Sequence, residues 1–207
     1  MTQNTSGLYK VLSSATVYSL FQNLVGANRL RKCFVEQHVL AQSGDRVLDI
    51  GCGTGAILAL LAEVDYTGYD PSAAYIHKAR EMYFDRGVFF VGEVGSTSMA
   101  MSGRFDIVLA MGVLHHLDDD QALQLFCTAH EVLAPGGRLI SIDPVFAPGQ
   151  HPLAKWMIRR DRGKNVRTES ELLRIAARQF SETKAMLRSD LLRIPYTHIV
   201  LECLRNA

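Results

Sequence analysis

Three glycines follow a short apolar run in the segment Val47-Leu48-Asp49-Ile50-Gly51-Cys52-Gly53-Thr54-Gly55. A glycine-rich loop between a strand and a helix lets the backbone approach a nucleotide-like ligand closely. The segment therefore predicts a cofactor-binding loop, and a turn that only connects strand to helix is the alternative.

The charge of Asp49 helps to identify the cofactor. With Ala56 in sixth place, the loop also fits the Gly-x-Gly-x-x-Ala fingerprint, so a nicotinamide or flavin dinucleotide has to be considered. A carboxylate at the end of the strand would lie near the pyrophosphate of such a ligand, whereas it suits a ligand that carries an ammonium and a sulfonium. The sign of the charge favours the cationic ligand.

Asp70 ends the next apolar run, 21 positions after Asp49. An acidic residue at this spacing can accept hydrogen bonds from both hydroxyls of a ribose. Aspartate is also a good cap for the helix expected to begin at Pro71-Ser72, and one residue can serve both purposes.

Two histidines, His115 and His116, follow the apolar run 105–111. A neutral imidazole at the carboxyl end of a strand can remove a proton from a hydroxyl or an amine, so either residue is a candidate general base. The alternative is that they only hold the loop by hydrogen bonds to the backbone.

The segment from Arg159 to Arg167 contains five cations in nine residues. Arginine side chains suit carboxylate and phosphate groups, so Arg159, Arg162 and Arg167 are predicted to contact an anionic or nucleotide-linked small acceptor. A solvated basic loop is the alternative interpretation.

Short apolar runs alternate with amphipathic stretches through the middle of the chain, which predicts a parallel sheet with helices on both faces. The expected strands are 47–50, 64–69, 88–91, 105–111 and 139–142, and helices are expected at 56–62 and 121–133. The flanks are expected to hold a helix from about Val17 to Ser43, a second helix opened by the capping box 168–171, and an antiparallel pair formed by 184–190 and 196–204.

The composition indicates one globular domain, because 207 residues with 48% hydrophobic side chains can bury a substantial core. The formal charge of +1 gives no reason to expect nucleic acid or an anionic membrane as a partner. The four cysteines are scattered, and no leader or membrane span is expected, so we predict a reduced cytoplasmic protein, monomeric or homodimeric.

Five motifs, taken in order, resemble the class I S-adenosylmethionine-dependent methyltransferases. They are 47–55, Tyr69-Asp70, Gly92-Glu93, 105–108 followed by 113–117, and Leu133-Ala134-Pro135-Gly136-Gly137. The resemblance is strong over residues 40–145. It implies a Rossmann-like, doubly wound α/β fold with a seven-stranded sheet that is mostly parallel and has an antiparallel terminal strand.

The resemblance also implies roles for individual residues. Asp49 and the loop would hold the methionine part of the cofactor, Asp70 the ribose, Glu93 and Val94 the adenine, and Ala110 and Met111 would border the sulfonium. Tyr18 is our candidate for an aromatic lid over it. The full set of expected cofactor-binding residues is Asp49, Gly51, Cys52, Gly53, Gly55, Asp70, Pro71, Glu93, Val94, Ala110, Met111 and Tyr18.

The predicted function is methyl transfer to a small-molecule acceptor, with residues 1–45 as a helical lid, 46–145 as the cofactor-binding core and 146–207 as an acceptor-covering segment with the terminal strand pair. Some small-molecule relatives bind a divalent metal through Glu-x-x-Glu-His, but this chain has Gly112-Val113-Leu114-His115-His116, so no metal is expected. Methylation of RNA or protein, and a non-catalytic cofactor-binding protein, are the alternatives.

Overall fold

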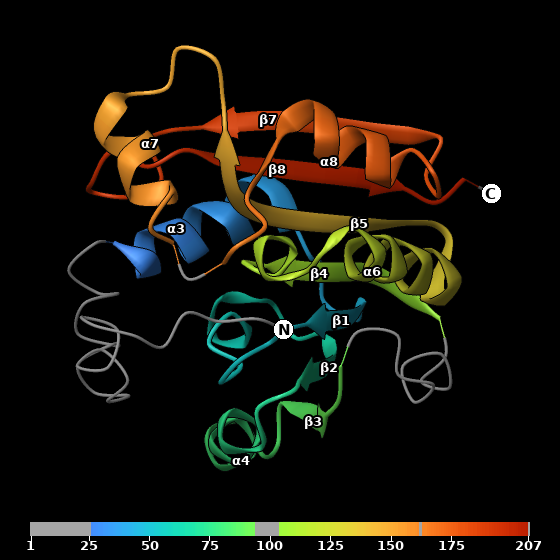
Figure 1. The fold of residues 1–207 in the computed structure, drawn as a ribbon. Helices are drawn as coiled ribbons and strands as arrows, with labels where there is room; N and C mark the ends of the chain where they lie inside the picture. Colours follow the sequence, from blue (N-terminus) through green and yellow to red (C-terminus); the bar gives the residue numbers. More distant parts are fainter. Residues whose placement is uncertain (1–25, 94–103, 162, 207) are drawn as a thin grey trace.

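A computed structural model describes residues 26–93, 104–161 and 163–206. Its centre is one twisted sheet in which the strands follow the order β3-β2-β1-β4-β5-β8-β7, and the short β6 pairs with β5 (Figure 1). The strands are β1 (Arg46–Ile50), β2 (Asp65–Asp70), β3 (Gly87–Val91), β4 (Phe105–Met111), β5 (Leu133–Phe146), β6 (Arg167–Thr168), β7 (Glu182–Arg188) and β8 (His198–Leu204).

The strand directions confirm the expected fold class. The neighbours from β3 to β5 all pair in parallel, whereas β8 runs antiparallel to both β5 and β7. The terminal antiparallel pair predicted from the alternating residues of the last two runs is therefore present.

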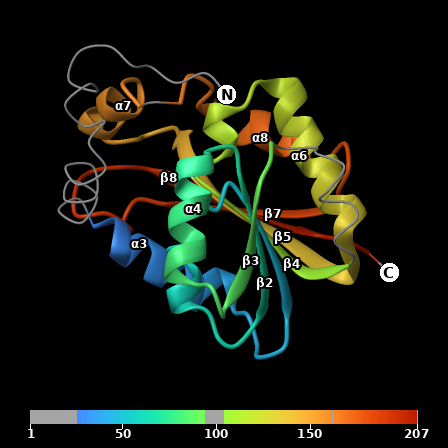
Figure 2. The same ribbon diagram turned by 90° about the horizontal axis from the view of Figure 1, so that it is seen from below.

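Helices cover both faces of the sheet, as Figure 2 shows from below. On one face lie α3 (Ala27–Phe34), which continues into the π-helical turn η1 (Val35–Val39), and α4 (Ala73–Met82). On the other face lie α6 (Asp119–Val132) and α8 (Glu169–Ala176), and α7 (Pro152–Ile158) follows the long strand β5. None of the helices within the described ranges has the length and apolarity that crossing a membrane requires.

Two local predictions have different outcomes. Thr168 caps α8 as expected, since its side chain accepts from the backbone of Glu171 and the Glu171 side chain bonds back to the backbone of Thr168. The helix predicted at 56–62 is wrong, because only the 3-10 turn η2 (Leu58–Leu60) forms there and the chain is extended again at Leu61. So short a segment gains few helical hydrogen bonds, and its buried side chains determine its path instead.

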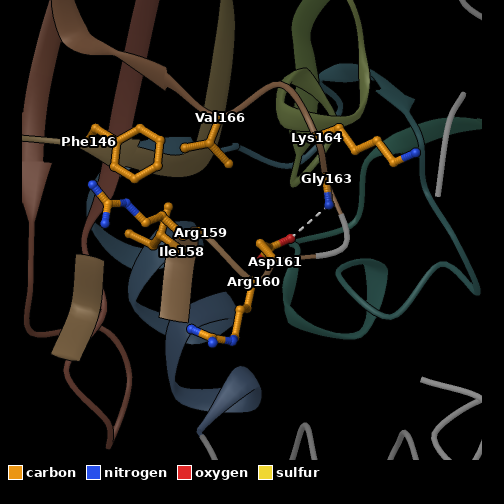
Figure 3. A pocket seen from close by; sticks show the side chains of 8 residues that line it. All are labelled: Phe146, Ile158, Arg159, Arg160, Asp161, Gly163, Lys164 and Val166. Carbon is orange, nitrogen blue, oxygen red and sulfur yellow. Dashed lines mark hydrogen bonds between the residues drawn. The ribbon is translucent and has the colours of Figure 1, made fainter. Parts of the chain in front are cut away.

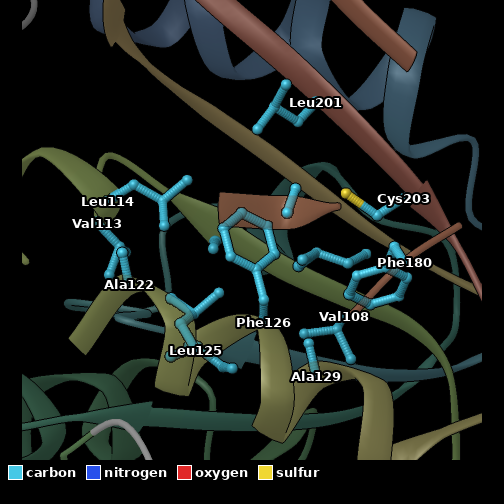
Figure 4. Packing of buried hydrophobic residues seen from close by; sticks show 14 of the residues in the cluster. Val108, Val113, Leu114, Ala122, Leu125, Phe126, Ala129, Phe180, Leu201 and Cys203 are labelled. Atoms are coloured by element: carbon cyan, nitrogen blue, oxygen red, sulfur yellow. The ribbon is translucent and has the colours of Figure 1, made fainter. Parts of the chain in front are cut away.

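The core consists of two apolar clusters, one on each face of the sheet. In the cluster under α6 and α8, Phe126 packs edge-on against Phe180 with ring centroids 6.4 Å apart, and Leu201 and Cys203 of β8 lie against the same layer (Figure 4). The other cluster joins Phe34 of α3 to the opposite face. These layers fix β1 beside β4, where the strand order reverses and open α/β sheets bind their ligands.

Candidate functional site

The glycine loop packs directly against the ends of β2 and β4. Gly51 and Cys52 donate their backbone N–H groups to the carbonyl oxygen of Tyr69, at 2.7 and 3.0 Å. Gly51 has a φ of 78°, and a Cβ there would lie 2.6 Å from Val113 Cγ2, so a side chain does not fit. A Cβ on Gly53 would meet nothing within 4 Å, so this glycine borders open space in the described structure.

Asp49, one residue before the end of β1, is almost fully buried, at 3% exposure. Tyr66 donates its hydroxyl to Asp49 Oδ2 at 2.6 Å, but Asp49 Oδ1 has no hydrogen-bond partner among the described residues. Burial raises the pKa of Asp49 to about 7; the Tyr66 bond lowers it, and the nearby charge of Asp70 raises it. A buried carboxylate oxygen that lacks a partner is a position where a cationic ligand group fits.

Asp70 connects the glycine loop to α4. Its Oδ2 accepts from the N–H of Gly53 at 2.9 Å, and its Oδ1 accepts from the N–H of Ser72 at 2.8 Å. Burial raises the pKa of Asp70, while these two bonds lower it. Because each carboxylate oxygen has a second lone pair, the local structural role leaves room for two ligand hydroxyls.

The remaining predicted cofactor residues surround the same edge of the sheet. Glu93 is exposed just after β3, Ala110 is fully buried and Met111 partly exposed at the end of β4. Cys52 is buried within the loop, and Pro71 follows Asp70 directly. Val94 and Tyr18 lie outside the described residues, so the expected contact to the adenine at Val94 and the lid at Tyr18 stay predictions.

His115 lies in the 3-10 turn η3 (Leu114–His116) after β4, between two carboxylates. Its Nδ1 is 2.7 Å from Asp143 Oδ1 on β5, its backbone N–H donates to the same oxygen at 3.2 Å, and its Nε2 is 3.4 Å from Asp161 Oδ1. Burial alone would lower the pKa of His115, but the bonds to Asp143 and Asp161 outweigh it and raise the pKa to about 9. The two carboxylates thus favour the protonated form of the ring at neutral pH.

This charge state bears on the expected general base. A protonated imidazole donates from both ring nitrogens and has no lone pair to accept a proton, so the raised pKa favours a hydrogen-bond donor role for His115. The ring of His116 lies against it, with centroids 4.0 Å apart. A catalytic role for either histidine stays a prediction.

Asp161 and its partners were missed by the sequence analysis. Asp161 accepts from the N–H of Gly163 at 3.0 Å and from the hydroxyl of Tyr196, whose ring lies tilted against His198 with centroids 5.0 Å apart. Burial alone would raise the pKa of Asp161, but the bonds from His115, Tyr196 and Gly163 hold it well below its ordinary value. Asp143 directly follows the apolar run 139–142, so the sequence could have indicated it as a site residue. Asp161 lies within a run of cationic residues, and its sequence neighbours do not indicate a site role.

Arg167 makes structural contacts that the sequence analysis did not anticipate. It is 7% exposed, and its guanidinium donates to the carbonyl oxygens of Leu114 and Leu117, at 2.9 and 2.7 Å, and to Asp119 Oδ1 at 2.9 Å. These contacts attach the basic segment to η3 and α6, so Arg167 has a structural role, and its expected contact with an acceptor stays a prediction. Arg162 lies outside the described residues.

A cavity of about 490 Å³ opens between the end of β5 and the segment that follows α7 (Figure 3). In Figure 3 the side chains of Arg159, Arg160 and Lys164 point in different directions and do not converge on one point. Arg160 stacks on the ring of Trp156, 4.2 Å from its centroid. The cavity is lined by Phe146, Ile158, Arg159, Arg160, Asp161, Gly163, Lys164 and Val166.

Known proteins resemble this chain in sequence and fold. Residues 47–137 match the family model described as a methyltransferase domain. A ubiquinone biosynthesis O-methyltransferase from Pectobacterium atrosepticum is 33% identical over 124 residues, which cover 58% of this chain and 51% of that protein. The chain thus spans about half the length of the curated relatives it matches.

Solved structures agree on the fold. The S-adenosylmethionine-dependent methyltransferase SibL has a TM-score of 0.74 at 17% identity and covers 97% of this chain and 60% of its own. The magnesium protoporphyrin IX methyltransferase from Synechocystis PCC 6803, solved with bound SAH, has a TM-score of 0.68 at 19% identity. The match covers 95% of this chain and 97% of that protein. The strand order, these fold likenesses and the match over residues 47–137 make the chain similar to the S-adenosylmethionine-dependent methyltransferases.

Proposed function

We propose that the protein binds S-adenosylmethionine at the carboxyl ends of β1 and β2 and transfers its methyl group to an oxygen atom of a small-molecule acceptor. The observation that carries the proposal is the buried Asp49 Oδ1, which has no hydrogen-bond partner among the described residues. Asp49 lies just before a glycine loop that borders open space at Gly53. The family match and the O-methyltransferase relatives support the reaction class and the oxygen acceptor.

The residues at this edge fit the cofactor chemically. Asp49 provides a negative oxygen for the α-ammonium group, Asp70 has acceptor lone pairs for the ribose hydroxyls, and Glu93 can accept from the adenine amino group. S-adenosylmethionine, when bound, supplies a methyl group on a positively charged sulfur. What the chain adds is alignment of the acceptor with that methyl group and exclusion of water.

The acceptor side lies at the ends of β4 and β5. Val113, the residue before η3, packs on Gly51, so the start of this turn is in contact with the glycine loop. Phe146 ends β5 and lines the cavity together with Arg159 and Lys164. These cations support the finer proposal of an anionic acceptor, because they offer a positive surface at the cavity even though they do not converge.

Calorimetry with S-adenosylmethionine, its demethylated product and NAD tests the cofactor assignment. We expect both adenosyl compounds to bind and NAD not to bind. Asp70→Ala should weaken adenosyl binding about tenfold or more, since it removes the ribose acceptor and the support of the loop. Asp65→Ala is the matched control, because Asp65 is an exposed carboxylate at the other end of the same strand.

A preference for NAD would overturn the cofactor assignment, and equal losses in the two variants would remove the role of Asp70. The acceptor can then be sought by incubating the protein with labelled cofactor and metabolite extracts and recording which compounds gain one labelled methyl group. Incorporation into RNA or protein alone would contradict the small-molecule acceptor.

A further inference from the structure

Asp161 stands between the cavity and His115. It lines the cavity together with Gly163, whereas His115 is not among the described residues that line it. The same carboxylate lies 3.4 Å from His115 Nε2. Removing the Asp161 side chain from this position would therefore connect the cavity with the histidine ring.

The segment around Asp161 is docked closely on the histidine. Asn165 donates its N–H to the carbonyl oxygen of His115 at 3.0 Å, and a Cβ on Gly163 would overlap the His115 ring. Tyr196 of the β7–β8 connection donates its hydroxyl to the second oxygen of Asp161. Asp161 is thus held at the histidine by the close packing of its own segment and by the hydroxyl of Tyr196.

Charge explains why a carboxylate occupies this position. Asp143 on β5 already holds Nδ1 of the ring, so the second proton of the imidazolium, on Nε2, needs its own acceptor. The ring of His116 and the hydroxyl of Tyr196 also face this cluster, as does His198, whose pKa burial lowers to about 4, which favours its neutral form. The Nε2 position is therefore a buried site for one negatively charged oxygen, and Asp161 fills it.

We propose that Asp161 occupies the position of the acceptor oxygen, and that the acceptor is an oxyanion, such as a phenolate, an enolate or a carboxylate, that replaces Asp161 at His115 Nε2. The inference rests on the proposed function and deepens it by naming the substrate class. His115 is then a catalytic residue that binds the reacting oxygen. Asp161 occupies the same position when no acceptor is bound, so that only a negatively charged ligand replaces it readily.

The proposed methyl transfer needs no general base. A lone pair of the acceptor oxyanion forms the new O–C bond, the C–S bond breaks, and its electron pair neutralises the sulfonium to a thioether. No proton moves during the step, and the imidazolium stays protonated. A neutral alcohol or amine cannot replace Asp161 at equal cost, because it would leave a buried cation without its anion.

Binding of a simple phenolate tests the exchange independently of methyl transfer. The probe is 4-nitrophenolate at about pH 8, where the phenol is ionised and His115 of the unaltered chain keeps its proton, and nitrobenzene is its uncharged counterpart. In Asp161→Asn the free ring loses one of the two carboxylates that raise its pKa, and the bound phenolate supplies that negative charge instead. Asp161→Asn removes the competing charge, so it should bind 4-nitrophenolate about tenfold tighter than the unaltered chain does, while nitrobenzene affinity stays the same. Unchanged or weaker phenolate binding in this variant would overturn the proposal.

Matched variants separate the exchange from general loosening of the structure. Asp190→Asn also removes a carboxylate, but one that pairs with Arg188 on β7, and it should leave phenolate affinity unchanged. Tyr196→Phe loosens Asp161 without removing its charge and should give a smaller gain, which also keeps the test valid if Asp161→Asn does not fold. His115→Gln should abolish the preference for phenolate over nitrobenzene, and a preserved preference would contradict the role of His115.

Two further measurements distinguish the possible failures. The nitrogen-15 NMR shifts of His115 should correspond to an imidazolium at neutral pH, and a neutral ring would refute the inference. Adenosyl binding by calorimetry should be the same in Asp161→Asn as in the unaltered chain. If the chain binds no adenosyl compound at all, the proposed function is wrong. If it binds one but a phenolate does not replace Asp161 at His115, only the further inference is wrong.

Discussion

Asp49 and Asp70 are carboxylates at the ends of neighbouring strands, but their surroundings differ. Both oxygens of Asp70 accept from backbone N–H groups, whereas Asp49 has one bond, from Tyr66, and one buried oxygen without a described partner. Asp49 is therefore the residue whose charge is most sensitive to a bound cation.

Affinity for S-adenosylmethionine should rise with pH through the titration of Asp49. Its pKa of about 7 without ligand means that a proton competes with the cofactor's ammonium group, by up to about tenfold per pH unit below that value. The measurement is calorimetry between about pH 5.5 and 7.5, below the loss of the cofactor's own α-amino proton. Tyr66→Phe should shift the profile to higher pH, since it removes the bond that lowers this pKa. Affinity that falls with rising pH would contradict the assignment.

At the level of elements, the contacts between loops assemble the site. The glycine loop hydrogen-bonds to β2 and packs against Val113, the residue before η3. The segment after α7 hydrogen-bonds to η3 through Asn165 and Arg167. Each layer positions the next, so the acceptor side depends on contacts far from the cofactor.

Arg167→Met should destabilise the protein by about 3 kcal/mol, because it leaves the carbonyls of Leu114 and Leu117 without their buried donor. Arg174→Met is the control, since Arg174 is 72% exposed and lies 3.9 Å from the same partner, Asp119. It should change stability by less than about 0.5 kcal/mol. Urea unfolding of both variants gives the comparison, and equal effects would show that the buried contacts are not what matters.

The whole molecule carries a formal charge of only +1, which bears on the alternative of RNA as a partner. A protein that contacts several phosphates loses binding steeply with salt, by about a thousandfold or more between 50 and 200 mM for six to ten contacts. We expect only weak binding of an RNA oligonucleotide and no inhibition of small-molecule methylation by added RNA. Tight, salt-dependent RNA binding in a gel-shift titration would favour the RNA methyltransferase alternative.

The sequence by itself determined the order of the strands and helices, the parallel sheet with its antiparallel end, and the cofactor loop with Asp49 and Asp70. It could do so because these features depend on local spacing: an apolar run, three glycines, and an acidic residue 21 positions later. The prediction of a helix at 56–62 was wrong, because the spacing of apolar residues does not show which backbone conformation tertiary packing gives to a short segment.

Only the tertiary structure decided the acceptor side. Asp143 on β5, Asp161 after α7 and Tyr196 before β8 are far apart in the sequence, and they meet around His115 because β5, β8 and the segment after α7 pack at one edge of the sheet. The raised pKa of His115 follows from its two carboxylate partners, which outweigh burial, and the structural role of Arg167 follows from the carbonyl oxygens within its reach.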